Sequence, residues 1–273
     1  TINFGRINMT SMRKLIVLLI IMVTAHPGFS KIIKKPIPER MVVLTFDDAT
    51  ASQYSVVAPL LKEYGFGATF FICEFPPNFA DTSKYMNWRQ IRELDRMGFE
   101  IANHTQSHPA IAKLTDDKII AQLQYIERKC DSMQIKRPVT FAYPGYSLSL
   151  PAIKILQERG YQFSRAGGSR PYDPQTDHPL LIPSWAMNST NKPLIMDALK
   201  EAHDGKIVVL TIHGVPDVEH PWVNTTPQLF KEYLQYLKEN HFTVIALRDL
   251  AKYINVKKAL KNITPDLTKK LKN

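Results

Sequence analysis

Short apolar runs alternate with amphipathic stretches along most of the chain. Runs with the length of a buried strand cover seven segments: residues 41–46, 67–73, 99–102, 139–143, 161–164, 207–212 and 242–246. Stretches with helical spacing of apolar residues lie between them: residues 53–65, 87–97, 115–133, 151–159, 193–203 and 226–240, with a last helix expected to start near Arg248. This alternation predicts a parallel sheet covered by helices.

About seven strand–helix units fit a closed barrel better than a short open sheet. The predicted fold is therefore α/β, an irregular (β/α)7-type barrel with its active site at the C-terminal ends of the strands. Several polar or turn-forming residues lie at or just after those ends: Asp47, Asp48, His104, Pro144 and His213. Their shared position predicts that they line one rim of the barrel.

The formal charge of +10 belongs to the two ends of the chain rather than to its middle. Residues 1–40 contain seven Lys or Arg and one Glu, and residues 257–273 contain six Lys and one Asp. The two ends thus carry +11, which leaves about −1 for residues 41–256. We therefore expect no nucleic-acid partner, because the predicted barrel has no basic excess. The basic tail at 257–273 is expected to be solvated, or to contact an anionic cell-envelope surface.

The first thirty residues have the pattern of upstream residues followed by a secretory signal peptide. Met12-Arg13-Lys14 precedes an apolar run at 15–23, which is too short to cross a bilayer, and Pro27-Gly28 follows it. Alternatives are a buried apolar helix or an uncleaved anchor. We expect an exported protein, located in the periplasm, the cell envelope or the medium. Residues 31–40 are predicted to be a linker into a domain that spans 41–256.

The chain has only two cysteines, Cys73 and Cys130, which excludes a disulfide scaffold. Cys73 ends an apolar run and Cys130 lies in a helical pattern. Two buried thiols or one disulfide both fit this pattern, because an exported protein can form a disulfide.

The candidate chemistry begins with the acidic pair that follows the first strand. Asp47 and Asp48 would point to opposite sides while still in a strand, but beyond its last ladder bond the chain can turn both toward one mouth. One carboxylate could then bind a metal ion and the other could accept a proton. A turn or a helix cap is the alternative role for such a pair.

Two histidines follow the third predicted strand at a spacing of four. On one helical turn this spacing would place the rings of His104 and His108 on the same side, as a shared metal ion requires. One carboxylate and two imidazoles would make a three-ligand site with room for water. His213, which ends another apolar run, could donate a proton because histidine titrates near working pH. A buried structural histidine is the alternative there.

These segments together resemble the polysaccharide deacetylases of the NodB-homology type, carbohydrate esterase family 4, over roughly residues 40–253. The motifs that carry the resemblance are residues 45–48 (TFDD), 104–109 (HTQSHP), 141–146 (FAYPGY) and 211–213 (TIH). The resemblance implies that Asp47 is the catalytic base and that Asp48, His104 and His108 hold a divalent metal, most simply Zn²⁺. It also implies that Gly145 offers a backbone N–H to the oxyanion and that His213 is the general acid.

The chain departs from the family pattern at several places. Ala142 stands where the third motif often has an arginine that orients the base, and Arg165, after a later strand, could supply that guanidinium. The glycine and the aromatic residue at 145–146 are in reversed order, and Thr211 replaces a usual leucine. No Asp-Trp pair of a fourth motif is evident, although Trp185 would either line the groove or belong to the core.

The resulting functional hypothesis is an exported, metal-dependent hydrolase that removes N-acetyl groups from an N-acetylated polysaccharide or glycan. Two alternatives remain: an amidase or O-acetyl esterase with the same fold, or a non-catalytic glycan-binding barrel. The loop at 214–223 is rich in polar and aromatic residues and should border the groove, where Asp217 either orients His213 or is solvated. The polymer, the metal and the oligomeric state stay open.

Overall fold

Eight parallel strands form a single sheet in the computed structural model, which describes residues 31–271. The strands are β1 (Met41–Phe46), β2 (Thr69–Ile72), β3 (Glu100–Asn103), β4 (Thr140–Ala142), β5 (Phe163–Arg165), β6 (Trp185–Ala186), β7 (Val208–Ile212) and β8 (Thr243–Ile245). Their order is β5-β4-β3-β2-β1-β7-β6, and β8 pairs with β1 outside this path. All seven predicted strands are confirmed, and β6 is an additional short one.

The sheet curls into a barrel because a short segment joins its two edges. Ile182 accepts a hydrogen bond from the N–H of Ala166 and donates one to the carbonyl of Ser164, at 2.7 and 2.8 Å. A few residues later, Trp185 and Ala186 form β6 and pair with β7. This arrangement matches the predicted irregular (β/α)7-type barrel.

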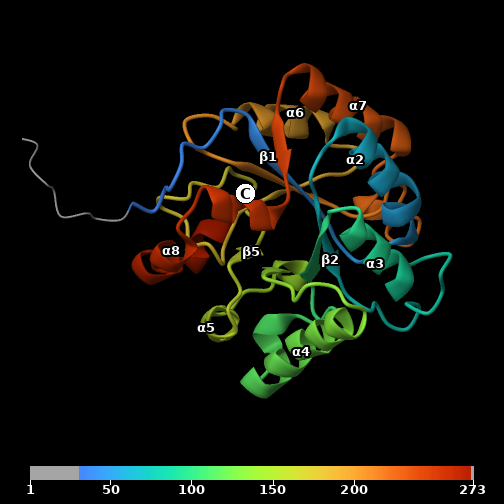
Figure 1. The fold of residues 1–273 in the computed structure, drawn as a ribbon, viewed down its shortest axis with the longest axis horizontal. Coiled ribbons are helices and arrows are strands. Elements are labelled where there is room, and N and C mark those ends of the chain that lie inside the picture. The colour runs from blue at the N-terminus through green and yellow to red at the C-terminus, as the bar shows by residue number, and fades with distance from the viewer. Residues whose placement is uncertain (1–30, 272–273) are drawn as a thin grey trace, which may run out of the picture. The chain divides into compact units, whose positions relative to one another are not determined.

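Helices surround the strands on the outside of the barrel (Figure 1). The α-helices are α2 (Ala58–Tyr64), α3 (Trp88–Arg96), α4 (Asp116–Ser132), α5 (Leu150–Glu158), α6 (Lys192–Lys200), α7 (Pro227–Glu239) and α8 (Val256–Asn262). The shorter turns are η1 (Gln53–Val57), η2 (Ile111–Lys113), η3 (Pro144–Tyr146), η4 (Pro221–Val223), η5 (Leu247–Lys252) and η6 (Leu267–Leu271). The helix expected near Arg248 is a 3-10 helix, η5, and the α-helix α8 begins only at Val256.

Side chains near the helix starts determine where several of these helices begin. The Asn87 side chain accepts a hydrogen bond from the Gln90 N–H, and Gln90 accepts one from the Asn87 N–H, which completes a capping box at α3. Ser149 caps α5 in a similar way by accepting from the Ala152 N–H. These caps satisfy amide groups that the first helical turn leaves without backbone partners.

The core has two faces because successive strand residues point to opposite sides of the sheet. Along β1, Val42, Leu44 and Phe46 pack outward against the helices. Met41 and Val43 belong to a second cluster that fills the barrel interior and is closed at one end by residues of η5. The interior cluster is mostly apolar at the end closed by η5, where the buried Glu100 carboxylate accepts hydrogen bonds from Thr69, Thr140 and the Arg248 N–H, and the polar residues of the predicted rim occupy the other end.

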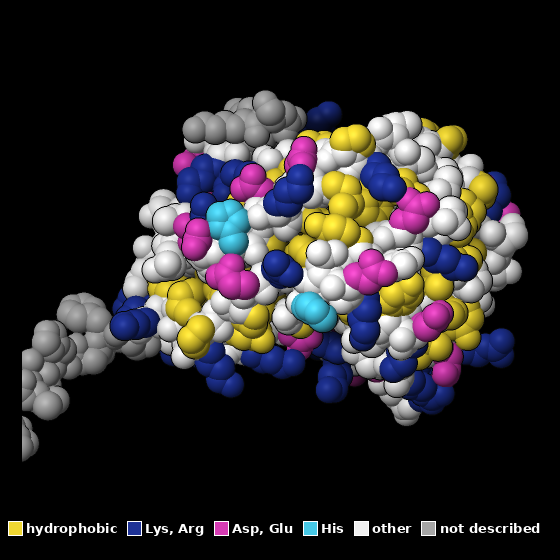
Figure 2. Space-filling model, turned by 90° about the horizontal axis from the view of Figure 1, so that it is seen from above, with side chains coloured by type: hydrophobic (Ala, Val, Ile, Leu, Met, Phe, Trp, Pro, Cys, Tyr) yellow, Lys and Arg dark blue, Asp and Glu magenta, His cyan; other side chains and the backbone are white. Residues whose placement is uncertain are grey.

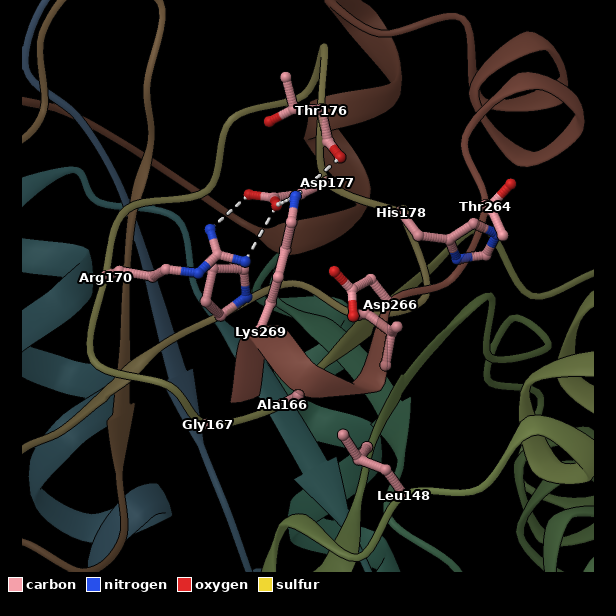
Figure 3. Close-up of a pocket in the computed structure, with 12 residues that line it drawn as sticks. Leu148, Ala166, Gly167, Arg170, Thr176, Asp177, His178, Thr264, Asp266 and Lys269 are labelled. Atoms are coloured by element: carbon pink, nitrogen blue, oxygen red, sulfur yellow. Dashed lines mark hydrogen bonds and ion pairs between the residues drawn. The ribbon is translucent and has the colours of Figure 1, made fainter. Parts of the chain in front are cut away.

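The segments on either side of the predicted domain pack against it. In the predicted linker, Ile33 forms an antiparallel bridge with Ile254, and Ile32 and Ile37 pack against the interior cluster. In the predicted tail, the Lys269 amine lies 3.0 Å from the Asp177 carboxylate, which Arg170 also holds at 2.7 Å (Figure 3). Lys269 thus attaches the described part of the basic tail to the barrel through a buried acid.

Charged side chains of both signs are interspersed on the face seen in Figure 2, with no large area of a single sign. Within the described range, no helix combines the length and the apolar character that crossing a membrane requires. The predicted signal peptide at residues 1–30 lies outside the described residues. Cys73 and Cys130 are both free and buried, so the disulfide alternative is not what the structure shows.

Candidate active site

Both carboxylates of the acidic pair reach the barrel mouth, and the backbone shows how. The Asp47 N–H still bonds to the Ile212 carbonyl at 2.9 Å, so Asp47 continues the inward-facing set of β1. Asp48 then adopts a left-handed backbone with φ of 71°, which ends the strand alternation. As a result, two consecutive carboxylates face one site, and each is only 4% exposed.

His104 and His108 also come together, but not on a helix. The helical expectation was wrong, because residues 104–108 form an irregular loop in which Thr105 and His108 have positive φ angles of 69° and 54°. The Asn103 side chain accepts from the Thr105 N–H, and the Thr105 hydroxyl accepts from the His108 N–H. This turn brings the two imidazole centroids to 4.9 Å from each other.

The nitrogens of these histidines and one oxygen of Asp48 have the separations that a shared metal ion needs. The Nε2 atoms of His104 and His108 lie 3.5 and 3.6 Å from Asp48 Oδ1. All three potential ligand atoms lie within 4.8 Å of one another. Ligands about 2.0–2.2 Å from a tetrahedral zinc ion would be about 3.4 Å apart. The His104 Nδ1–H donates to the Ala142 carbonyl at 2.8 Å, which leaves Nε2 free to act as a ligand.

The charge states of Asp48 and His108 favour cation binding, whereas burial would lower the pKa of His104 but Asp47 and Asp48 outweigh it and raise that pKa, so a metal ion there would displace a proton. Burial by itself would raise the pKa of Asp48, but His104, His213 and His108 outweigh it and hold the pKa well below the ordinary value. Burial and the neighbouring His104 lower the pKa of His108 to about 4, so its imidazole is neutral at neutral pH. A carboxylate and a neutral imidazole are the forms that bind metal ions.

Asp47 is held by a buried arginine and keeps one oxygen unoccupied. Its Oδ2 accepts from Arg165 Nη2 at 2.5 Å, and Arg165 is fully buried. Its Oδ1 is buried and has no hydrogen-bond partner among residues 31–271. An ionised carboxylate with a fixed orientation and a free oxygen has the requirements of a proton acceptor.

Arg165 occupies this place because of two of the sequence departures. Ala142 is the direct neighbour of Arg165 across the β4–β5 pair, so the small side chain stands beside the arginine. Arg165 Nη1 also donates to the Thr211 hydroxyl at 2.6 Å, a contact that a leucine could not make. Ala142, Arg165 and Thr211 therefore form one structural unit around Asp47.

His213 lies next to the acidic pair but lacks the expected orienting carboxylate. Its Nε2 is 3.7 Å from Asp48 Oδ2, and its buried Nδ1 has no hydrogen-bond partner in the described part of the chain. Asp217 does not contact it: its carboxylate accepts from the Gly214 N–H at 3.0 Å and from the His220 N–H at 2.8 Å. Asp217 thus shapes the loop rather than orienting His213.

The site opens into a pocket of about 260 Å³. Gly145 lines it with a φ of 54°, and the following Tyr146 uses its own N–H to bond the Tyr143 carbonyl at 3.0 Å. The Tyr146 ring lies over the Arg165 guanidinium, 5.5 Å from ring centroid to Cζ. A side chain at position 167 would come within 2.9 Å of that ring, so Gly167 leaves the space for it. Trp185, by contrast, belongs to the core.

Sequence reasoning missed several residues at this site. The Cys73 thiol donates to Asp48 Oδ1 at 3.7 Å, and burial together with the two nearby aspartates raises its pKa well above the ordinary value. Phe75, His220 and Trp222 also line the pocket. Aromatic residues in loops carry no periodic signal: the loop at 214–223 pointed toward His220 and Trp222, and nothing in the sequence pointed toward Phe75.

Comparison with known protein families agrees with this geometry. A model of the family described as polysaccharide deacetylase matches residues 34–164, which include the acidic pair, both histidines and Gly145. A peptidoglycan-N-acetylglucosamine deacetylase from Bacillus cereus is 26% identical over 219 residues, covering 80% of this chain and 91% of that protein. The chain is similar to the polysaccharide deacetylases over most of its length. A chitin deacetylase from a Pestalotiopsis species is 30% identical over 123 residues, 45% of this chain and 40% of its own length.

Solved structures of deacetylases of carbohydrate esterase family 4 share the fold. The Xyl-CE4 domain of a multidomain xylanase from the hindgut metagenome of Trinervitermes trinervoides superposes with a TM-score of 0.56 at 20% identity, covering 79% of this chain and 91% of that one. A pseudoenzyme of the same family from Bacillus anthracis gives a TM-score of 0.54 at 20% identity, covering 78% and 65%. These similarities establish that the chain shares the barrel fold of these structures.

Proposed function

We propose that this chain is an exported, metal-dependent hydrolase that removes N-acetyl groups from an N-acetylated polysaccharide. The main observation behind this proposal is that two sets of residues lie together in one pocket. Asp48, His104 and His108 offer a ligand triad, while Asp47 beside Arg165 offers a poised proton acceptor. A glycan-binding barrel without activity would need neither set.

A divalent ion held by the triad, most simply Zn²⁺, would polarise the acetamide carbonyl and lower the pKa of water. Asp47 would take the proton from the attacking water through its free Oδ1. The backbone N–H of Gly145 would donate to the oxyanion, and one such donor is typically worth about 3 kcal/mol. His213, on the other side of Asp48, would return a proton to the departing sugar amine.

The rearranged third motif supports catalytic competence. Arg165 reaches Asp47 from β5, one strand away from the position usual in the family, and the charge beside the base is retained. Thr211 gives the relocated guanidinium a second acceptor. The arginine therefore comes from a different strand than is usual in the family, and its contact with the proposed base is kept.

Export and the choice of an N-acetylated glycan rest on the signal-like pattern of residues 12–30 and on the relatives. The relatives include a peptidoglycan-N-acetylglucosamine deacetylase and a chitin deacetylase, and peptidoglycan and chitin are both polymers that contain N-acetylated sugars. We therefore expect a polymer of N-acetylated sugars as the substrate. Finding the protein only inside cells that produce it from the intact gene would contradict export.

The decisive experiment combines metal analysis of the purified protein with acetate release from a panel of glycans. The panel contains N-acetylglucosamine oligomers, peptidoglycan and O-acetylated xylan. Acetate from the first two and not from the third supports the N-deacetylase, whereas acetate only from the third would establish the O-acetyl esterase. No acetate from any member, with the metal bound, would contradict the proposal.

Asp47→Asn separates the base from the metal triad. The variant should bind the metal with near-normal affinity, because Asp47 is not among the proposed ligands. Its turnover should fall by about 100-fold or more, the lower limit usually attributed to a general base. Near-normal turnover in this variant would show that Asp47 is not the base.

A further inference from the structure

The loop at residues 214–223 is held in one shape beside the pocket. The buried Asp217 accepts from the Gly214 and His220 N–H groups, and its own N–H donates to Asn224 Oδ1 at 2.8 Å. Glu219 adds an ion pair to Lys84 at 3.0 Å. A loop whose backbone is bonded in this way presents its side chains in fixed positions.

A ladder of aromatic rings runs from the core to the surface and ends in this loop. It starts at the buried Tyr85, on which Phe75 stacks with centroids 6.1 Å apart and planes within 5°. His220 packs on Phe75 at 5.2 Å, and Trp222 packs edge-on against His220 at 5.5 Å. Phe75 also contacts the proposed metal ligand His108, at 5.0 Å. The ladder therefore connects the metal site with the outermost ring.

Trp222, the outermost ring, is unusual because it is 71% exposed although an indole is the largest apolar side chain. It lines the same pocket as Asp47 and Asp48. Val218, in the same loop, is also 71% exposed but does not line the pocket. An exposed aromatic ring held by neighbouring rings at a pocket edge is a surface prepared for a flat apolar partner.

We propose that Trp222, supported by His220 and Phe75, is the platform on which a neighbouring pyranose of the glycan stacks while the acetamide group faces Asp47. The axial C–H groups on one face of a β-linked N-acetylated pyranose carry partial positive charge, and an aromatic face carries partial negative charge. Trp222 would then contact the neighbouring sugar. The other pocket side chains, Asp47 and Asp48 among them, would contact only the sugar whose acetamide group reacts. The inference rests on the proposed function, because it assigns the second sugar of the same substrate.

The consequence is a preference for oligomers over single sugars that depends on one side chain. Binding is measured by titration calorimetry with N-acetylglucosamine and its β-1,4 tetramer, in an Asp47→Asn background to prevent turnover. Trp222→Ala should weaken tetramer binding by about tenfold, which corresponds to about 1.4 kcal/mol. Monomer binding should change less than twofold. Trp222→Phe should keep part of the gain, and Val218→Ala is the matched control.

The outcomes separate this inference from the proposed function. If Trp222→Ala leaves tetramer binding unchanged, or if the parent protein binds monomer and tetramer equally, the platform is refuted even when acetate is released normally. If tetramer binding depends on Trp222 but the chain with Asp47 intact releases no acetate, the platform stands and the deacetylase proposal fails. In an active enzyme, Trp222→Ala should raise KM for the tetramer and leave kcat within about twofold, since the ring does not touch the reacting atoms.

Discussion

Removing the guanidinium of Arg165 should damage the site more than any change of similar size elsewhere in the barrel. Arg165→Met keeps most of the side-chain volume but leaves the buried Asp47 carboxylate without its cation and without the hydrogen bond at 2.5 Å. Breaking a buried ion pair on one side typically costs about 3–5 kcal/mol. Part of this cost should appear as lower stability and part as lower activity, because burial disfavours a carboxylate that has lost its cation.

Moving the arginine from position 165 to position 142 tests whether the loss of activity comes from removing the guanidinium beside Asp47. Ala142 is the direct neighbour of Arg165 on β4, and adjacent strands are about 4.8 Å apart, so an arginine at position 142 can reach Asp47. Arg165→Met should lower kcat/KM by about 100-fold, the lower range attributed to a general base. Ala142→Arg combined with Arg165→Ala should have a kcat/KM at least about tenfold above that of Arg165→Ala alone, which corresponds to about 1.4 kcal/mol.

The assay is acetate release under kcat/KM conditions, together with urea unfolding of each variant. Arg165→Lys is the informative intermediate: it keeps the charge but loses the planar guanidinium that bonds Asp47 through Nη2 and Thr211 through Nη1. It should therefore retain more activity than Arg165→Met and less than the parent. If Arg165→Met unfolds at the same urea concentration as the parent and keeps its kcat/KM, the ion pair has no role and the relocation argument fails.

Two further changes test the metal triad and the acid sensitivity of the fold. His108→Ala should weaken metal binding by more than the roughly 10- to 100-fold that loss of a residue supporting a ligand costs. Chelator competition measures the affinity. An equal loss in the exposed control His203→Ala would contradict the role of His108 as a ligand. Burial lowers the pKa of His178 from 6.5 to about 4. As the pH drops, the imidazole is therefore protonated in the unfolded state before it is protonated in the folded state. The free energy of unfolding should fall by about 3 kcal/mol between pH 6.5 and pH 4. His178→Asn, which keeps an acceptor for the Leu180 N–H, should flatten this part of the unfolding profile; an unchanged slope would refute the assignment.

The sequence predicted the barrel because its strands are buried on both faces. All six residues of β1 are buried, so the strand reads as an unbroken apolar run followed by Asp47 and Asp48. The strand β6 escaped prediction because it has only two residues, Trp185 and Ala186, and gives no periodic signal. Its existence depends on pairing with β7, which is a tertiary contact and is not encoded in a local pattern.

The sequence predicted the site residues that lie at or just after the end of a strand. Because Arg165 ends β5, the sequence predicted that it lies on the rim of the barrel. Its contact with Asp47 depends on how far the guanidinium reaches into the barrel, which the sequence does not show. The turn between His104 and His108 was predicted wrongly because spacing alone does not distinguish a helical turn from a loop stabilised by Asn103. The loop at 214–223 was expected to border the groove, as its Trp222 does, but the contact of Cys73 with Asp48 and the place of Phe75 could not be predicted, because they depend on tertiary packing.

The contacts around Asp47 bear on how departures from a family motif should be interpreted. Taken singly, the loss of an arginine at position 142 and the appearance of Thr211 suggest a degenerate site. In the structure both changes surround Arg165, since the alanine stands next to it and the threonine accepts its second hydrogen bond. A chain that had lost selection for catalysis would have no reason to place a fully buried cation 2.5 Å from the candidate base, given the cost of burying an unpaired charge. Motif residues in this family are therefore better compared by the atoms they place beside Asp47 than by their positions in the sequence.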